Sequence, residues 1–520
     1  MGFAFAPFKY SFFLSYVLLV PFIDDIVSTK SFREALVKGY WFGLFSAFSA
    51  LNWVAFNTIG GYAVILLLHP WSYMLFASFF FLFWKSIKAK AIFPGIVLWT
   101  ALEAARSWGQ LRFPWINLNY SLSYDINFIQ IIEFTGPLFL TLFIMTANFV
   151  LWYLWRKYSR QKSLKIVDFT ALAAVLLIWA GISIWGNGRI SELRSNNYKV
   201  LKVGIAQPDI DAYDKWKPKQ RQLAYKRLFA YSDSLAEHAV DLVVWPETAI
   251  PSYVRGNISI LRKVQKWTDD HQTAILTGIP DYKATTERHF SYNAVWLVHP
   301  DSLTLDVYYK QYLVPGGETI PFKNYFSILE DVHVGGGNFW PGTEMKTLDF
   351  EVGMQVGKWR DGAWQPGKTD EKIVTEIRVI PAICYESIFP GLIRTQKHMN
   401  KGNLIAVITN DGWYGNSAGP YQHFQASILR AIENRTSVVR AANNGISGFF
   451  DITGVYYERT ELFTSDWRYA YLPISTEDTA YSRFGNRWLW LLCGISLIWM
   501  LYFLLFSEQF KHRVDIRSAE

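Results

Sequence analysis

The chain has little cysteine and little charge for its size. Its 520 residues include only two cysteines, Cys384 and Cys493, so a disulfide framework cannot be argued. Charged residues make up 18% of the chain, whereas soluble domains average about 25%. With 51% hydrophobic residues and no repeats or low-complexity segments, the chain is neither disordered nor collagen-like. The composition also disfavours a purely soluble enzyme.

Positively and negatively charged residues are also not balanced, but the excess of positive charge does not indicate a nucleic-acid binder. The 51 Lys+Arg outnumber the 43 Asp+Glu and give a formal net charge of +8. A nucleic-acid-binding surface would gather such an excess into a basic stripe with interleaved aromatic residues. Here many of the extra cations lie between hydrophobic runs. That distribution is typical of a membrane protein.

Seven apolar stretches are long enough, or nearly so, to cross a hydrocarbon core of about 30 Å, which needs about 20 helical residues. They lie near 10–27, 37–57, 62–84, 91–106, 126–153, 166–186 and 488–507. We interpret the first as an uncleaved helix, because Lys9 gives a weak basic region and no small-residue cleavage site follows. The sequence therefore predicts a membrane domain of about six spans at 1–190, a C-terminal span at 488–507 and a cytoplasmic tail at 508–520.

The basic residues between the apolar stretches predict an orientation. Alternate loops and the C-terminal tail carry most of them, for example Lys30, Lys85, Arg156 and Lys511. The positive-inside rule places such loops in the cytoplasm. We therefore expect the long segment 198–475 to lie outside the cytoplasm, on the periplasmic face of the inner membrane if the cell is Gram-negative.

The segment 198–475 has the pattern of a layered α/β domain. Short, continuous apolar runs typical of buried strands lie at 199–207, 241–247, 273–280, 292–300, 377–386 and 404–411. Helix-like stretches at 217–238 and 421–435 fall between some of them. These elements predict a domain built around a largely buried sheet.

Three reactive residues stand at the ends of such runs. Glu247 follows Trp-Pro, Lys310 follows two tyrosines, and Cys384 ends a predicted strand. Each alone has an ordinary structural explanation. An idle thiol is, however, a liability in an oxidising compartment. A thiol nucleophile needs a base and a cation for the developing oxyanion, and the three residues together supply those groups.

The order of these segments resembles a known family. The segments 245-WPE-247, 309-YKQYLVPGGE-318 and 384-CYE-386 are similar to the Glu-Lys-Cys site of the nitrilase, or carbon–nitrogen hydrolase, superfamily. The multi-span frame, with 113-FPWINLNYS-121 and 207-QPDIDAYDKW-216, narrows the resemblance to the apolipoprotein N-acyltransferase family. The similarity covers nearly the whole chain. It implies a polytopic α-helical membrane domain and an extracytoplasmic nitrilase-like domain, 198–475, folded as an αββα sandwich.

The resemblance also implies a role for each reactive residue. Cys384 would attack the ester carbonyl of a phospholipid, typically phosphatidylethanolamine, with Glu247 as base and Lys310 as the oxyanion cation. Glu318 would orient Lys310 or serve as a second carboxylate. The thioester would then pass its acyl chain to the α-amino group of an S-diacylglyceryl-cysteine lipoprotein. The family needs no metal and no soluble cofactor. We expect a monomer whose partners are the bilayer, the phospholipid donor and the lipoprotein acceptor, with no nucleic acid.

Flanking residues are candidates for supporting roles. Tyr385 and Glu386 would shape the turn at the nucleophile and hold the site charges, and a plain structural role is the alternative. Trp216 and Trp413 match family aromatics near the site, where they would cover acyl chains, and ordinary core packing is the alternative. His423 invites a Cys–His pair, but we interpret it as a structural residue at the start of a helix.

Two other functions stay open. A membrane-tethered, nitrilase-like amidase would transfer the acyl group to water, although a mere anchor needs only one helix. A non-catalytic lipid-binding protein would need the fold alone, and the complete set of Glu, Lys and Cys speaks against it.

The chain also departs from the family pattern in three places. The family usually has one further N-terminal span, so we expect that this chain begins late or has lost that helix. Gly316 stands where an aromatic residue usually precedes Gly-Glu, and the stretch 331–376 is long and gives no interpretation.

Overall fold

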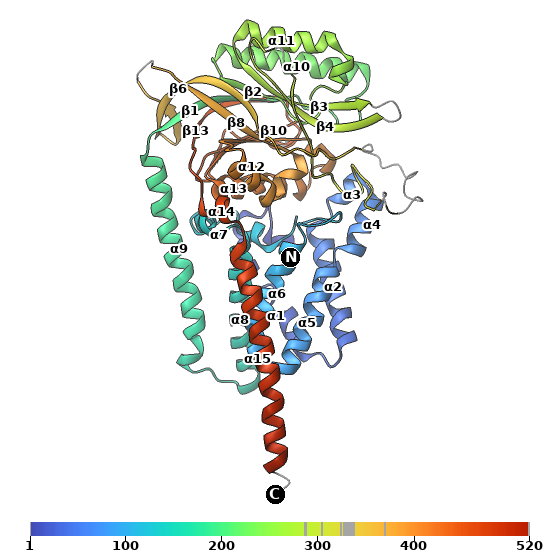
Figure 1. Cartoon of the computed structure of the whole chain (residues 1–520), viewed down its shortest axis with the longest axis vertical. Coiled ribbons are helices and arrows are strands. Elements are labelled where there is room, and N and C mark those ends of the chain that lie inside the picture. Colours follow the sequence, from blue (N-terminus) through green and yellow to red (C-terminus); the bar gives the residue numbers. More distant parts are fainter. Residues whose placement is uncertain are drawn as a thin grey trace. The chain divides into compact units, whose positions relative to one another are not determined.

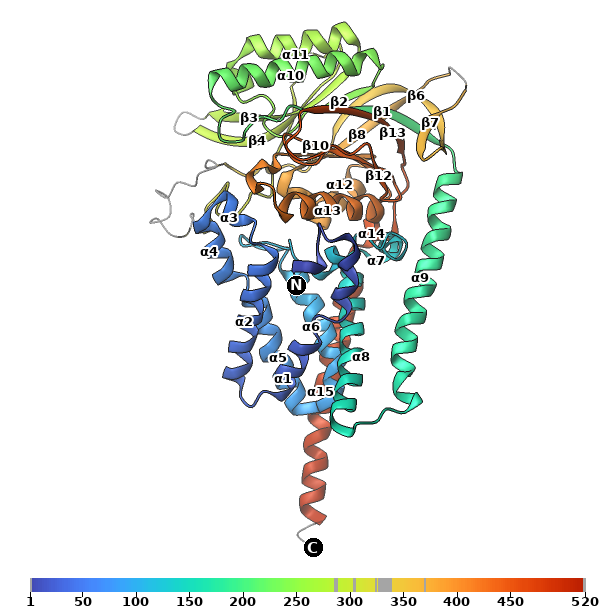
Figure 2. The same cartoon turned by 180° about the vertical axis from the view of Figure 1, so that it is seen from behind.

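The computed structural model describes residues 2–284, 289–302, 305–322, 325, 339–368 and 371–517. Its chain divides into two compact units, which Figures 1 and 2 show from opposite sides. Unit 1 comprises Met1–Phe128, Thr135–Ile184 and Phe484–Glu520. Unit 2 comprises Ile129–Phe134 and Trp185–Arg483. Each unit is described by itself.

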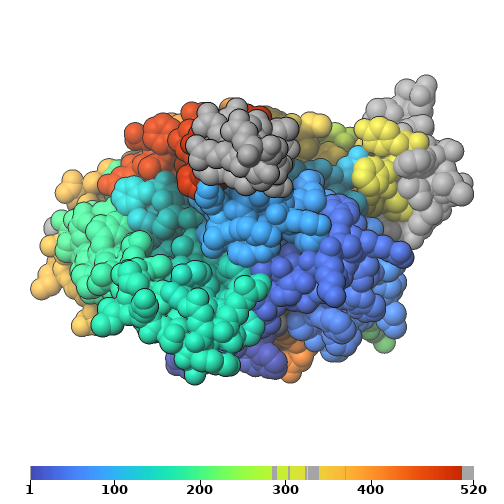
Figure 3. All heavy atoms as spheres, turned by 90° about the horizontal axis from the view of Figure 1, so that it is seen from below, coloured from blue at the N-terminus to red at the C-terminus, as the bar shows by residue number. Residues whose placement is uncertain are grey.

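Unit 1 is built from apolar helices, as its composition predicts. They are α1 (Val20–Ser28), α2 (Phe32–Ala50), α3 (Val54–Asn57), α4 (Ile59–Leu68), α5 (Trp71–Ile87), α6 (Ile92–Ala105), α8 (Leu138–Gln161), the first part of α9 (Thr170–Ser195) and α15 (Arg487–Arg517). The helix α8 contacts both α1 and α6. In Figure 3 the blue surface of the early helices adjoins the blue-green surface of the later ones.

Five helical stretches among the described residues are long and apolar enough to cross a membrane. They are Lys9–Ser28, Ile59–Ala105, Leu138–Gln161, Ile166–Ser195 and Arg487–Leu505, and the second of them contains α4, α5 and α6. The helix α2 is apolar only in part, since Arg33, Glu34 and Lys38 lie in its first two turns. The stretch expected at 126–153 is not one continuous helix, because a short 3-10 turn (Phe128–Ile131) and α7 (Ile132–Thr135) come before its long helix. Its long helix α8 begins after Pro137, which occupies the cap position.

Unit 2 contains thirteen strands among its described residues, in the order β12-β11-β10-β9-β8-β6-β1-β2-β3-β4-β5, with β13 beside β1 and β7 beside β6. The strands are β1 (Tyr198–Gln207), β2 (Leu242–Val244), β3 (Ala274–Ala284), β4 (His289–Val298), β5 (Asp306–Tyr309), β6 (Leu348–Arg360), β7 (Ala363–Pro366), β8 (Ile373–Ile383), β9 (Leu404–Thr409), β10 (Ser437–Ala442), β11 (Gly448–Phe450), β12 (Tyr456–Tyr457) and β13 (Asp466–Ile474). Because β6 pairs with both β1 and β8, it joins two halves. Each half has three neighbouring parallel strands, β1-β2-β3 and β8-β9-β10.

The two halves of the sheet form the middle layers of a sandwich. Helices cover their outer faces, α10 (Pro218–Glu237) and α11 (Ile258–His271) on one half, α12 (Pro390–Met399) and α13 (Ala418–Asn434) on the other (Figure 1). Val203 of β1 and Val379 of β8 belong to one buried core between the halves. Val243 of β2 points to the opposite side, where it shares a second core with α10 and α11. This arrangement confirms the predicted αββα fold, and it explains why the strands are continuous apolar runs.

The limits of unit 2 differ from the predicted 198–475. The helix α14 (Ala480–Phe484) belongs to it as far as Arg483, because the Thr479 hydroxyl donates to the Glu433 carbonyl at 2.6 Å. The segment Ile129–Phe134, which the sequence assigned to the membrane domain, also belongs to unit 2. Its Glu133 carboxylate pairs with the buried Arg435 guanidinium at 2.7 Å. A prediction from the lengths of apolar runs does not detect such a buried ion pair.

The long stretch 331–376 contributes structure that the sequence left without interpretation. Its described part forms β6, β7 and the start of β8, so it supplies the strand that joins the two halves. Residues 331–338 and 369–370 lie outside the described residues.

Candidate active site

Cys384 stands at the sharp turn where β8 ends. The strand runs directly into the 3-10 helix η9 (Cys384–Ile388), and Cys384 has a φ of +49°. This left-handed conformation is strained for a residue with a Cβ and is common at functional sites. A nucleophile at such a strand end projects from the edge of the sheet. The Cys384 side chain is buried, and its sulfur lies 4.0 Å from the hydroxyl of Tyr414.

Glu247 follows β2, where Pro246 ends the run of strand residues as expected. The Pro246 carbonyl accepts a hydrogen bond from the Gly278 backbone N–H at 3.2 Å, which holds this segment against β3. A Cβ at Gly278 would lie 2.6 Å from the Glu247 Cα, so the close approach requires glycine. The buried Glu247 carboxylate accepts a hydrogen bond from the Asn293 amide at 2.7 Å.

Lys310 follows β5 and lies between two carboxylates. Its ammonium is 2.8 Å from Glu318 Oε1 and 3.9 Å from Glu247 Oε1. The Asn293 amide donates to the same Glu318 oxygen at 3.0 Å and therefore bridges both carboxylates. Gly316, with a φ of +75°, allows the tight turn that returns Glu318 to Lys310. The departure from the family pattern at Gly316 does not displace Glu318.

Glu386 connects the lysine segment to the cysteine turn. Its Oε1 accepts hydrogen bonds from the Tyr308 hydroxyl at 2.9 Å and the Gln311 backbone N–H at 2.7 Å. Its Oε2 accepts the Ile383 N–H at 2.9 Å. The carboxylate thus ties the strand before Cys384 to the residues on both sides of Lys310. Its partners belong to the scaffold, and they fix the position of the site.

The three remaining candidates differ in exposure. Tyr385 is buried and packs edge-on against the Phe389 ring with centroids 5.0 Å apart. Trp216 is 48% exposed, which excludes core packing. Trp413 is half-buried, and its ring meets that of Tyr213 edge-on at 4.8 Å. The two tryptophans therefore present aromatic surface outside the core.

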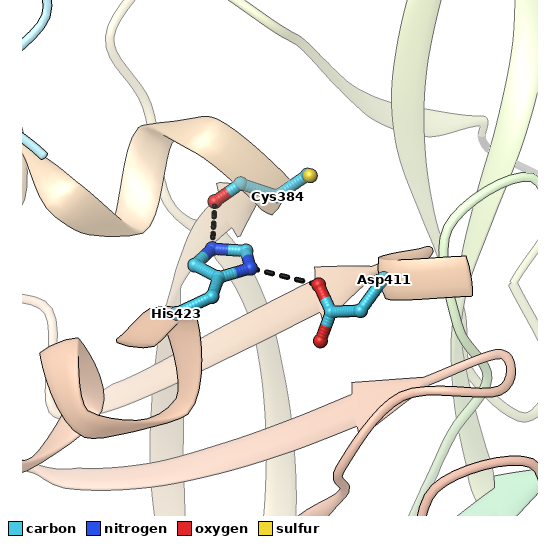
Figure 4. A group of neighbouring side chains, drawn as sticks. All are labelled: Cys384, Asp411 and His423. Atoms are coloured by element: carbon cyan, nitrogen blue, oxygen red, sulfur yellow. Dashed lines mark hydrogen bonds and ion pairs between the residues drawn. The ribbon is translucent and has the colours of Figure 1, made fainter. Parts of the chain in front are cut away.

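A second polar cluster holds the backbone of Cys384 (Figure 4). His423 of α13 has its Nε2 3.0 Å from the Cys384 carbonyl oxygen and its Nδ1 2.8 Å from Asp411 Oδ1. Asp411 also binds Arg440 at 2.7 Å. Figure 4 shows the Cys384 sulfur pointing away from the imidazole ring. This geometry supports the structural interpretation of His423.

Donor atoms of Cys384, Asp411 and His423 do lie within 4.8 Å of one another, as in a metal site. The imidazole and carboxylate atoms, however, already have protein partners, and the Arg440 cation occupies the carboxylate. The donor set is therefore engaged in holding the nucleophile turn.

Burial and charge shift the pKa values of the reactive groups. Burial raises the pKa of Glu247 and the nearby Glu318 acts in the same direction, against the opposing effect of Lys310. A raised carboxylate pKa favours the uptake of a proton, as a general base requires. Burial and the Glu247 charge raise the pKa of the Cys384 thiol to about 12. Burial disfavours the charged form of Lys310, but Glu318 and Glu247 outweigh it and raise its pKa. The resting site therefore holds a neutral thiol and a fixed cation.

Sequence reasoning missed two polar residues of this site, Asn293 and Lys215. Asn293 is a buried amide directly before the apolar run 294–298 of β4, and a buried amide next to such a run is itself a signal of a buried polar contact. Lys215 is 5% exposed and stands beside Trp216 in a motif that the sequence had singled out. Burial lowers the pKa of Lys215 to about 8, with Glu247 and Cys384 acting in the opposite direction.

Comparisons with known proteins agree with this site and fold. A family model described as carbon-nitrogen hydrolase matches residues 202–482, and one described as the apolipoprotein N-acyltransferase N-terminal domain matches residues 1–150. The chain therefore belongs to the carbon–nitrogen hydrolase family. Both halves of the predicted resemblance, the membrane domain and the hydrolase-like domain, are confirmed.

The relatives narrow this class to one kind of member. An apolipoprotein N-acyltransferase of Chlorobaculum tepidum is 29% identical over 90% of this chain and 87% of its own length. That of Rickettsia prowazekii is 29% identical over 98% and 97%, and that of Haemophilus influenzae 28% over 96% and 91%. Among solved structures, a nitrilase-superfamily protein of Saccharomyces cerevisiae is 15% identical, with a TM-score of 0.37 over 53% of this chain and 90% of its own. We therefore assign the fold from the strand order of unit 2 and from the match to the carbon-nitrogen hydrolase family model, and not from this solved structure.

Proposed function

We propose that this protein is an N-acyltransferase that moves an acyl chain from a membrane phospholipid to the N-terminal α-amino group of S-diacylglyceryl-cysteine apolipoproteins, through a thioester on Cys384. The observation that carries the proposal is the meeting of Cys384, Glu247 and Lys310 in one buried site. The proposal is also supported by relatives named apolipoprotein N-acyltransferase, with which this chain aligns over most of their length.

In the first half-reaction, Glu247 takes the proton of the Cys384 thiol and the sulfur attacks the ester carbonyl of the donor. The Lys310 ammonium stabilises the oxyanion of the tetrahedral intermediate. When that intermediate collapses, the glycerol oxygen leaves with the proton that Glu247 holds, and a lysophospholipid departs. Glu318 and Asn293 keep Lys310 and Glu247 in register, as their hydrogen bonds indicate.

In the second half-reaction, the α-amino group attacks the thioester and Glu247 accepts its proton. Glu247 then returns that proton to the departing sulfur, which releases the Cys384 thiol. A buried thioester favours an amine over water as acceptor, because a closed site excludes solvent. The burial of Cys384 and Glu247 supports this preference over the amidase alternative.

The environment of the substrates is part of the proposal. Phosphatidylethanolamine is the donor we favour, and Trp216 and Trp413 offer aromatic surface to its acyl chains. The basic loops support a cell-membrane protein whose segment 198–475 lies on the periplasmic or outer face. Tyr385 and Glu386 serve the site by fixing the turn at Cys384.

The test is a product analysis with purified full-length protein in detergent. The protein is incubated with radiolabelled phosphatidylethanolamine and a synthetic S-diacylglyceryl-cysteine peptide. We expect an alkali-stable, amide-linked chain on the peptide, and none with Cys384→Ala. Free fatty acid as the only product would establish the amidase instead. Binding of the lipid with neither product would establish a lipid-binding protein.

A further inference from the structure

Lys215 is a buried cation whose ammonium has no partner among the described residues. Its side chain is 5% exposed. Its backbone N–H donates to the Asp211 carbonyl at 3.0 Å, but within the described part of the chain its Nζ makes no hydrogen bond or ion pair. The other buried lysines differ in this respect. Lys310 pairs with two carboxylates, and Lys397 donates to the Ser475 carbonyl at 3.4 Å. A lysine side chain that is only 5% exposed to solvent and has no ion-pair partner is costly and calls for a reason.

The groups that act electrostatically on Lys215 are those of the catalytic centre. The negative charges of Glu247 and of the ionised Cys384 both favour its charged form, and Lys215 in turn favours the ionised form of Glu247. Around Cys384 itself, the charged or titratable groups also include Lys310, Asp411 and Tyr414. His423 lies at the Cys384 carbonyl, and Glu386 lies in the same turn. Asp411 is neutralised by the Arg440 guanidinium at 2.7 Å.

Among the charged groups that act on Glu247, the charges do not balance without Lys215. The buried Glu386 carboxylate is held separately, by neutral donors. Glu247 and Glu318 carry two negative charges when ionised, and Lys310 carries one positive charge, which is held by Glu318 at 2.8 Å. A net negative charge in a buried site is strongly unfavourable. Transfer of the thiol proton to Glu247 moves this negative charge to the Cys384 sulfur but does not remove it.

We propose that Lys215 is a further positioning residue of the active site, a cation that balances the Glu247 carboxylate at rest and the Cys384 thiolate during catalysis. The proposal rests on the function proposed above, because it takes Cys384 as nucleophile and Glu247 as its base. Lys310 stabilises the substrate oxyanion, whereas Lys215 stabilises the charge of the nucleophile before attack. The two lysines therefore act at different stages of one reaction, Lys215 before the sulfur attacks and Lys310 when the oxyanion forms.

The test measures the reactivity of the Cys384 thiol in the absence of lipid. The only other cysteine, Cys493, is replaced by Ser, and the full-length protein in detergent is alkylated with iodoacetamide at pH 6 to pH 10. Only the thiolate reacts. Because the thiol pKa lies above this range, the rate of alkylation at each pH is compared. Lys215→Met should slow alkylation at neutral pH about tenfold, which corresponds to a rise of about one unit in the thiol pKa. Lys215→Arg should restore most of the rate.

Lys397→Met is the matched control. Lys397 is 1% exposed, and its burial also lowers its pKa to about 8, but the charged groups around it are Asp478, Lys401 and Glu477. Its loss should leave the alkylation profile unchanged. A Lys215→Met profile that superimposes on wild type, with unchanged thermal unfolding, would overturn the proposal.

A double-mutant cycle covers the case in which Lys215→Met folds poorly. The double variant Lys215→Met/Glu247→Gln removes both charges, so it should unfold at a higher temperature than the sum of the two single effects predicts. Strict additivity would contradict the charge balance. Neither measurement needs an acyl donor. A shifted alkylation profile without any acyl adduct on wild type would therefore reject the acyl transfer while keeping Lys215, and an adduct without a shift would do the reverse.

Discussion

Two polar clusters meet at Cys384, and they differ in how completely their groups are paired. On the carbonyl side, Asp411 accepts from Thr409 at 2.8 Å and is also bound by His423 and Arg440. Although burial opposes ionisation, Arg440 and His423 hold the pKa of Asp411 well below its usual range. On the thiol side, burial and Glu318 raise the pKa of Glu247.

The difference shows what separates a supporting carboxylate from a reactive one. Both Asp411 and Glu247 are buried in the same domain. Asp411 has a cation and two further donors, so its proton affinity is low and its position fixed. Glu247 has one amide donor at 2.7 Å and a lysine at 3.9 Å, so it keeps the capacity to accept a proton. Incomplete pairing is thus a property of the catalytic side.

The largest expected effect is on the thiol side. Lys310→Met should lower the rate of acyl transfer about a thousandfold, since one oxyanion-stabilising group is worth about 4 kcal/mol. Because Lys310→Met also leaves the Glu318 and Glu247 carboxylates without their cation, it should lower stability as well, so the rate is measured per folded molecule. A Lys310→Met protein that is less stable but fully active per folded molecule would show that Lys310 is a supporting residue, like Arg440. The two clusters would then not differ in function.

On the carbonyl side the expected loss is in stability. Arg440→Met leaves the Asp411 carboxylate buried without its cation, which costs about 3–5 kcal/mol. Denaturant unfolding should report this loss, and the activity per folded molecule should stay near wild type. Adding Asp411→Asn should recover part of the stability. A stable but inactive Arg440→Met protein would contradict the division between the clusters.

A backbone contact next to Glu247 gives a smaller effect. Gly278→Ala places a Cβ 2.6 Å from the Glu247 Cα and shifts the base. Misplacement by about 1 Å can cost about a hundredfold in rate. The control is Gly391→Ala in α12, where a Cβ meets nothing within 4 Å. Equal activity of both variants would show that the position of Glu247 is not critical.

The smallest effect is a difference in the pH dependence of stability. The lowered pKa of Asp411 contributes stability that is present above its ordinary range and is lost as the pH falls. The raised pKa of Glu247 acts in the opposite sense, so its contribution is lost as the pH rises through that pKa. The free energy of unfolding of Asp411→Asn should therefore fall less at low pH than that of wild type. Glu247→Gln should be more stable relative to wild type at neutral pH than at low pH. The same pH response for both variants would contradict the opposite shifts.

Much of the fold could be predicted from the sequence because burial imposes a pattern on it. The runs at 199–207 and 404–411 are apolar without alternation, and both became strands covered on two faces. By contrast, β6 alternates apolar residues with Gly and charged ones, and its role as the joint between the halves depends on partners far along the chain. The composition of a single segment does not predict which distant strands it pairs with.

The candidate site could be predicted where a residue type has few ordinary uses. Cys384 stood out as the lone cysteine of its domain, and the structure brings it near the predicted Glu247 and Lys310. Lys215 did not stand out, because a lysine in a sequence is ordinarily on the surface. Only the three-dimensional structure reveals that it is buried beside the reactive groups.

The most direct test of the account is the intact mass of the protein after incubation with phosphatidylethanolamine. Wild type should gain the mass of one acyl chain, neutral hydroxylamine should remove it, and Cys384→Ala should gain none. Glu247→Gln should form the adduct far more slowly. An adduct that survives hydroxylamine, or that forms equally on Cys384→Ala, would contradict a thioester at this cysteine.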